Sequence, residues 1–293
     1  MERLKSTESH LSIVADPPDQ YEEYNAVMDI IEKRRIKTVF QPIISLKTAE
    51  VYGYEALSRI VGPSVFSGPG FLFDAAKRQK LITQLEKLAR ETALNRANEL
   101  CIDKQVFLNI APSGIDLPEH EEGWTAQLSQ KYLAKQSNVV LELTEKMQFH
   151  DNELFNKAVA YYKRQGFIIA IDDFGAGFAG LNMLLRVEPH IVKIDRYLIE
   201  NIHLSTTKRL LLESIVLFCH KADIRVVAEG IERKEELKVA LDMNVDFAQG
   251  YFLARPETHL QNCAEEAREC IIGNCRTSYH GLNQNHNFIG SLV

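Results

Sequence analysis

Polar side chains recur at one position in this sequence, at the end of short apolar runs. They are five carboxylates, two amides and a lysine: Glu55, Asn109, Glu142, Asp172, Asp173, Lys193, Glu229 and Gln249. A single acid or amide at such a place is usually a helix cap or a turn residue. Repetition at seven successive runs instead indicates side chains that converge on one site.

Acids that converge repel one another, and burying them unpaired costs several kcal/mol per ion. Cations are therefore expected among them. The set offers oxygen ligands without His or Cys, which suits Mg²⁺ or Mn²⁺ rather than zinc. It holds more acids than one such ion needs, so two ions about 3.5–4 Å apart would fit, an arrangement that serves in-line attack on phosphate esters. Lys193 would then stabilise phosphoryl oxygens or orient a water.

The elements that must position these side chains are short apolar runs that alternate with longer amphipathic segments. Most runs are rich in Val and Ile, as strands buried on both faces are, and eight are predicted to be strands: 38–44, 51–57, 105–110, 139–143, 167–171, 191–194, 225–228 and 246–252. Apolar periodicity predicts helices over 21–35, 81–100, 152–165, 207–221 and 234–241. Strand then helix, repeated, implies parallel strands with right-handed crossovers.

Eight strands in a chain of 293 residues favour a TIM-like (β/α)₈ barrel, which takes about 250 residues and carries its active site at the carboxyl ends of the strands. Only six residues, SLKTAE, join the first two strands, whereas a parallel crossover needs a dozen or more. The first strand is therefore expected to run antiparallel to the second. A doubly wound open sheet is the alternative fold.

The domain prediction is one barrel with short extensions. Residues 1–25 are expected to be a loose leader, residues 26–258 the barrel, and residues 259–293 a C-terminal helix and tail. A net charge of −6 gives no electrostatic footprint for duplex nucleic acid. No apolar run approaches the roughly 20 residues of a membrane span, and no signal peptide is recognised, so a cytoplasmic protein is expected. Five cysteines without a CxxC pair argue against a disulfide framework or a zinc cluster.

Several motifs follow one another in a fixed order along the chain. They are Gln41-Pro42-Ile43, Glu55-Ala56-Leu57 with Arg59, Asn109 with Pro112, Glu142-Leu143-Thr144-Glu145, Asp172-Asp173-Phe174-Gly175, Val192-Lys193-Ile194-Asp195, Ala228-Glu229-Gly230-Ile231-Glu232 and Gln249-Gly250-Tyr251-Phe252. Over about residues 30–257, this series resembles EAL-domain cyclic di-GMP phosphodiesterases. A lone Glu-Ala-Leu carries no weight, whereas the whole series in order is highly specific.

The resemblance implies a role for each matching residue. One divalent cation, Mg²⁺ or Mn²⁺, would be held by Glu55, Asn109, Glu142 and Asp172, and a second by Asp172, Asp173 and Glu229. Lys193 would contact the attacking water or the phosphate, Gln249 would orient water and ligands at the metals, and Arg59 would bind a substrate phosphate. The nucleotide site would also be lined by Gln41, Leu57 and Pro112. The loop after Asp173 would be anchored by Glu145 and Glu232.

The reaction implied by the resemblance is hydrolysis of one 3′–5′ bond of cyclic di-GMP to linear pGpG. The resemblance also implies a homodimer, with the loop after Asp173 near its interface. In that loop Ala176 and Ala179 stand where many members carry hydroxyls, which concerns rate and regulation more than chemistry. Two other functions stay open: a module that senses cyclic di-GMP or a partner protein without turnover, and a barrel enzyme that acts on another phosphodiester or a phosphosugar.

Overall fold

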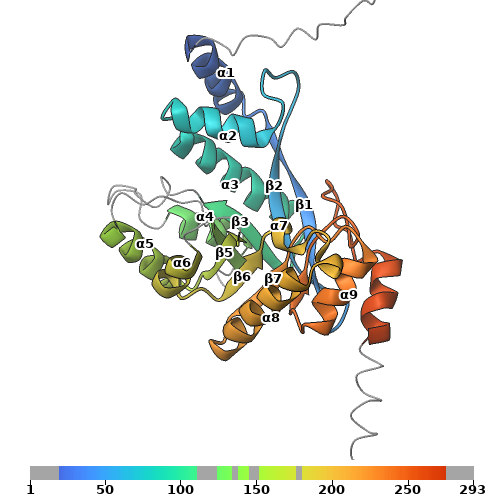
Figure 1. The fold of residues 1–293 in the computed structure, drawn as a ribbon. Helices are drawn as coiled ribbons and strands as arrows, with labels where there is room; N and C mark the ends of the chain where they lie inside the picture. Colours follow the sequence, from blue (N-terminus) through green and yellow to red (C-terminus); the bar gives the residue numbers. More distant parts are fainter. Residues whose placement is uncertain (1–19, 111–123, 134–137, 145–151, 176–179, 275–293) are drawn as a thin grey trace, which may run out of the picture.

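In the computed structural model the chain forms a closed barrel whose strands follow one another in sequence order (Figure 1). The structure describes residues 20–110, 124–133, 138–144, 152–175 and 180–274. The strands are β1 Ile36–Ser45, β2 Val51–Ile60, β3 Gln105–Ile110, β4 Val139–Thr144, β5 Ile168–Phe174, β6 Ile191–Ile194, β7 Arg225–Ala228 and β8 Phe247–Ala248.

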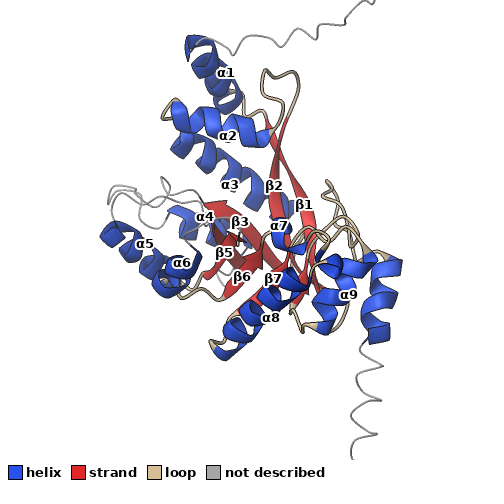
Figure 2. Cartoon of the chain, in the orientation of Figure 1, coloured by secondary structure: helices blue, strands red, loops and turns tan. Residues whose placement is uncertain are grey.

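Helices cover the outside of this barrel (Figure 2). They are α1 Gln20–Glu32, α2 Pro69–Arg78, α3 Ile82–Glu99, α4 Trp124–Leu133, α5 Asn152–Arg164, α6 Gly180–Val187, α7 Arg196–Ile199, the 3₁₀ helix η4 Ile202–Leu204, α8 Thr206–Lys221 and α9 Lys234–Asp242. Residues 265–274 are also helical. Among the residues that the structure describes, no helix combines the length and the apolar character needed to cross a bilayer.

The first strand is reversed. β1 runs antiparallel to both of its neighbours, β2 and β8, whereas the other neighbouring pairs are parallel. The short connection between β1 and β2 can form only a hairpin, because a parallel return needs a much longer crossover. The prediction of a TIM-like barrel with an antiparallel first strand is confirmed, and the open-sheet alternative is wrong.

All eight predicted runs form strands, but some boundaries differ. β2 continues to Ile60 because β1 begins at Ile36 and pairs with it there. β8 ends at Ala248 because the chain then folds against Ile231, whose N–H donates to Gln249 O (3.1 Å) and whose O accepts from Phe252 N (3.0 Å). Helix α1 begins at Gln20, close to the start of the helix predicted over 21–35.

Among the described residues, buried apolar side chains form three clusters that support the fold. The largest lies between the strands and the surrounding helices. A second packs α1 against α2 and α3, with Val27 and Ile30 fully or almost fully buried, which explains why α1 forms. Figure 1 shows α1 and α2 beside the ends of β1 and β2 that project beyond the other strands.

The third cluster fills the barrel interior. It consists of one residue from most of the strands: Ile43, Phe107, Val140, Ala170, Ile191, Val227 and Phe247. Successive side chains on a strand point to opposite faces. A residue two positions along from a member of this apolar layer therefore also points into the barrel.

Candidate functional site

A layer of polar residues follows the apolar layer inside the barrel. On the strands that run in the common direction, the polar residue comes two positions after the apolar one: Asn109, Glu142, Asp172, Lys193, Glu229 and Gln249. On the reversed β1 it comes two positions before Ile43, at Gln41, whose cross-strand partner is Glu55. We call these eight residues the polar layer. It lies at the carboxyl ends of the parallel strands, where barrel active sites are built.

Lys193 lies at the centre of the polar layer and is fully buried. Its Nζ lies 2.6 Å from Glu142 Oε1, 2.8 Å from Glu229 Oε1, 3.0 Å from Asp172 Oδ1 and 3.3 Å from Glu55 Oε2. One ammonium group thus contacts four carboxylates from four strands. This arrangement gathers the predicted acids around one point.

The electrostatics of the cluster are those of crowded, desolvated charges. Burial alone would lower the pKa of Lys193, but the carboxylates around it, Asp172 foremost, outweigh burial and raise that pKa well above its ordinary value. Burial raises the pKa of Glu142 and of Glu229 well above the ordinary value for a glutamate, against the opposing effect of Lys193. Lys193 therefore keeps its proton and stays charged. Its positive charge does not offset the cost of burying the negative charges of Glu142 and Glu229.

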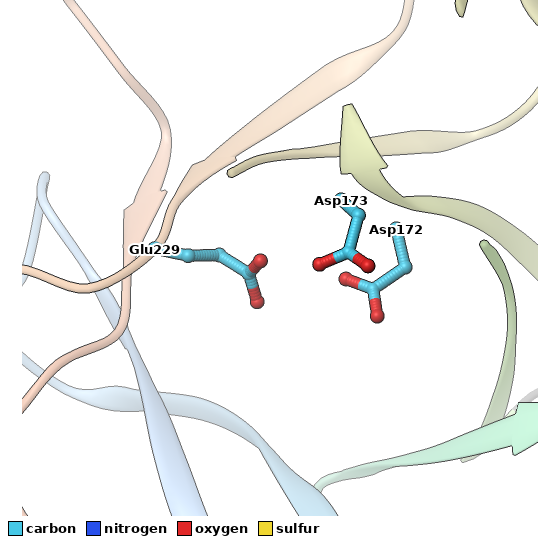
Figure 3. A group of neighbouring side chains, drawn as sticks. All are labelled: Asp172, Asp173 and Glu229. Carbon is cyan, nitrogen blue, oxygen red and sulfur yellow. The ribbon is translucent and has the colours of Figure 1, made fainter. Parts of the chain in front are cut away.

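Asp173 joins the site by a different route. The alternation of side chains would turn it away from Asp172, but its φ is +56°, in the left-handed region, and the pairing of β5 with β6 shifts register between Ile171 and Phe174. Carboxylate oxygens of Asp172, Asp173 and Glu229 consequently all lie within 4.8 Å of one another. Figure 3 shows the two aspartates at the end of one strand, facing Glu229 across the site.

The donor set fits divalent cations. Among the described residues, four carboxylates contact the Lys193 ammonium group and a fifth, that of Asp173, lies beside two of them, so negative charge is in excess. Glu142 Oε2 is buried without a hydrogen-bond partner among the described residues, a costly state for a carboxylate oxygen. Hard ions such as Mg²⁺ and Mn²⁺ prefer oxygen ligands of this kind.

Among the described residues, cavities on two sides of Leu57 adjoin the polar layer. The first, of about 300 Å³, lies over the acids and is lined among others by Glu55, Asp173, Glu229, Arg196 and Tyr251. The second, of about 310 Å³, lies between β2, β3 and α3 and is lined among others by Arg59, Asn109, Phe73, Glu86 and Arg90. Leu57, which was predicted to line the nucleotide site, lines both cavities and so lies between them.

The structure brings most of the predicted site residues together, with differences at the rim. Arg59 lies in the second cavity and donates to its neighbour's carbonyl, Ser58 O (2.9 Å). Asn109 pairs by register with Glu142, but it is exposed and lines that same cavity. Glu232 accepts from Arg196 Nη1 at 2.8 Å. The remaining predictions, at Pro112, Glu145, Ala176 and Ala179, lie outside the described residues.

Sequence reasoning missed several residues that line the cavities, among them Arg196, Tyr251 and Arg90. Arg196 and Tyr251 line the cavity over the acids, and each lies in or directly beside a matching motif that drew attention to its neighbours. Arg90 lines the second cavity, is 3% exposed, and packs over the Trp124 ring at 5.2 Å. In the sequence Arg90 has the appearance of an ordinary exposed helix arginine, so no local signal separates it from a solvated one.

The EAL domain family model matches residues 24–256 of this chain. The chain belongs to the EAL domain family. A probable cyclic di-GMP phosphodiesterase of Escherichia coli K12, PdeN, is 30% identical over 240 residues, which are 78% of this chain and 45% of PdeN. The chain spans only about half the length of the curated relatives that it matches first.

Solved structures of EAL proteins share the fold. A standalone EAL protein of Vibrio cholerae O395 in its c-di-GMP-bound form has a TM-score of 0.71 and 29% identity, covering 79% of this chain and 97% of that one. Klebsiella pneumoniae BlrP1 in a manganese and c-di-GMP complex has a TM-score of 0.71 and 28% identity, covering 78% and 58%. Relatives with the same barrel therefore bind cyclic di-GMP, in one case together with manganese.

Proposed function

We propose that this protein hydrolyses cyclic di-GMP to linear pGpG with the help of two divalent cations. The observation that carries the proposal is the polar layer, in which acids from several strands converge on Lys193 at the mouth of an EAL-family barrel. Buried carboxylates can lie this close together when bound cations offset their repulsion. Phosphate esters are substrates that pairs of such cations activate.

The proposed ligands divide into two overlapping sets. Glu55, Asn109, Glu142 and Asp172 would hold one cation, and Asp172, Asp173 and Glu229 would hold the other. When bound, such ions lower the pKa of water and neutralise charge on the phosphate. The proximity of Asp172, Asp173 and Glu229 supports the second set more directly than the exposed Asn109 supports the first.

The chain's own residues would guide the displacement. Because Lys193 keeps its proton, its Nζ donates hydrogen bonds to the attacking water or a phosphoryl oxygen and does not act as a base. As water adds to phosphorus, the bond from phosphorus to the 3′ oxygen would break and one water proton would pass to a carboxylate of the layer. The layer would return that proton to the departing 3′ oxygen, which leaves as a hydroxyl, while the other water proton stays on the new phosphate group. The product keeps its phosphate on the 5′ oxygen.

Substrate binding would use both cavities. The guanidinium of Arg59 would hold a phosphate, since its fork of donors suits phosphate oxygens. Leu57, which lines both cavities, would pack against the nucleotide, with Gln41 and Pro112 as further lining. Glu145 and Glu232 are proposed to anchor the loop after Asp173.

The test is to incubate the protein with cyclic di-GMP and Mg²⁺ or Mn²⁺ and to look for pGpG. We expect pGpG as the product and none in excess chelator. Measurable binding without product in either ion would instead assign a sensor. Hydrolysis of generic phosphodiesters at least as fast as cyclic di-GMP would assign a broader barrel phosphodiesterase.

We also propose that the protein forms a homodimer through the region next to the site. Leu181 and Leu185 of α6 are 73% and 75% exposed, and α6 directly follows the loop after Asp173. Two exposed leucines on one helix are apolar surface that a second copy would cover. Light scattering on the wild type and on Leu181→Asp/Leu185→Asp tests this, with a dimer expected only for the wild type.

A further inference from the structure

A chain of side-chain amides connects Glu55 to a backbone carbonyl on the other side of β1. Gln41 Nε2 donates to Ala254 O at 3.1 Å. Gln249 Nε2 donates to Gln41 Oε1 at 3.0 Å and to Glu55 Oε2 at 2.6 Å. All three residues are buried, with 5% to 7% of the surface of each exposed.

The carbonyl at one end fixes the direction of the whole chain. Ala254 O can only accept a hydrogen bond, so Gln41 must turn its NH₂ group toward it. The Oε1 of Gln41 then faces Gln249. Because this oxygen can only accept, Gln249 must direct its own NH₂ group toward it. Gln249 therefore presents donors to Glu55, and its Oε1 is buried without a hydrogen-bond partner among the described residues.

This direction matters because a glutamine amide has two nearly identical orientations. Turned by 180°, Gln249 would place its oxygen against Glu55 Oε2, where two acceptors at 2.6 Å repel. The bond that Gln249 donates to the Gln41 oxygen removes that alternative. The orientation of Glu55, which also contacts Lys193 at 3.3 Å, thus depends on a residue one step removed from it.

We propose that Gln41 is a positioning residue for the metal site: it orients Gln249, which in turn holds Glu55 ready for a cation. The link to turnover rests on the proposed function, whereas the link to metal binding does not. This role differs from the lining of the nucleotide site implied by the resemblance. The two roles predict different measurements.

A substitution at Gln41 separates the two roles. Gln41→Met keeps the length of the side chain but removes both the donor to Ala254 O and the acceptor that Gln249 needs. Thr38→Val serves as the control, because Thr38 is buried on the same strand but points away from the polar layer.

The first measurement is the affinity for Mn²⁺ without substrate, by calorimetry and by the electron paramagnetic resonance signal of free Mn²⁺. We expect Gln41→Met to bind Mn²⁺ about tenfold more weakly. An effect of this size is usual when a hydrogen-bond partner that orients a metal-ligating side chain is removed. Thr38→Val should bind Mn²⁺ within about threefold of the wild type, because Thr38 is no partner of a metal ligand. With cyclic di-GMP, Gln41→Met should lower kcat by about tenfold and change KM little.

Unchanged Mn²⁺ affinity in Gln41→Met, with a raised KM, would overturn the proposal and leave Gln41 as a lining residue. Equal weakening in Gln41→Met and Thr38→Val would also overturn it, because Thr38 takes no part in the chain of amides. If Gln41→Met does not fold, Gln41→Val carries the same expectation. If the wild type does not turn over cyclic di-GMP, the proposed function fails, but the Mn²⁺ affinities still decide the role of Gln41.

Discussion

Replacing Lys193 by methionine tests the charge balance on which the site depends. Lys193 is fully buried and its ammonium group contacts four carboxylates. Methionine has a similar length and no charge, so the variant leaves those acids without a cation. In a chelator, the carboxylates must then take up protons or repel one another.

The expected loss of stability follows from this geometry. Removing one partner of a buried ion pair costs about 3–5 kcal/mol, which is roughly a hundred- to several-thousand-fold in the folding equilibrium. Excess Mg²⁺ or Mn²⁺ should recover part of it, since a ligand at a hundred times its dissociation constant stabilises the folded state by about 2.7 kcal/mol. The variant should gain more from the ion than the wild type does, because no ammonium group competes for the same oxygens.

The assay is urea unfolding of both proteins at neutral pH, in chelator and in excess Mg²⁺. Lys234→Met is the matched control: Lys234 lies 3.2 Å from Glu266, but the two side chains are 43% and 62% exposed. Surface pairs of this kind contribute about 0–1 kcal/mol, with no dependence on Mg²⁺ expected. If Lys193→Met were as stable as wild type in chelator, or gained nothing more from Mg²⁺, the reasoning about crowded acids would be refuted.

Three further changes test other parts of the account. Gly250→Ala should destabilise the fold by about 2 kcal/mol or more, because a Cβ there would overlap the backbone of Ile231; Gly70→Ala, with open space around it, should be neutral or slightly stabilising in the same thermal unfolding assay. Glu55→Ala should abolish production of pGpG, and retention of more than roughly a few per cent of activity would contradict its assignment as a ligand. Arg59→Ala should raise KM for cyclic di-GMP by about tenfold or more with a smaller change in kcat, and an unchanged KM would remove Arg59 from phosphate binding.

The barrel was predictable because its signals are local and repeated. Each strand run is short and apolar, the helices between them show the helical period, and the brief connection after β1 permits only a reversed pair. The polar residues at the strand ends were visible for the same reason. The ends of the strands were harder to predict. Strand β8 stops at Ala248 because of backbone contacts with Ile231, which lies before α9 in the sequence.

Other parts of the site depend on conformation that residue types do not reveal. Asp173 reaches the other acids only through its left-handed backbone and the shift of register beside it. A strand pattern alone would point it away from Asp172. Arg90, buried against Trp124, depends on the packing of α3 against α4, and long-range packing of this kind leaves no periodic signal in the sequence.

The reversed direction of β1 decides which side chain completes the polar layer. If β1 ran with the other strands, the position two residues after Ile43 would face the site, and that residue is Ser45. A serine hydroxyl is too short to reach across the layer and anchor on a carbonyl. Because β1 is antiparallel, Gln41 takes that place opposite Glu55, and its long amide spans from Ala254 to Gln249. A rule that searches only the carboxyl ends of strands passes over Gln41, since on this strand the site lies toward the amino end.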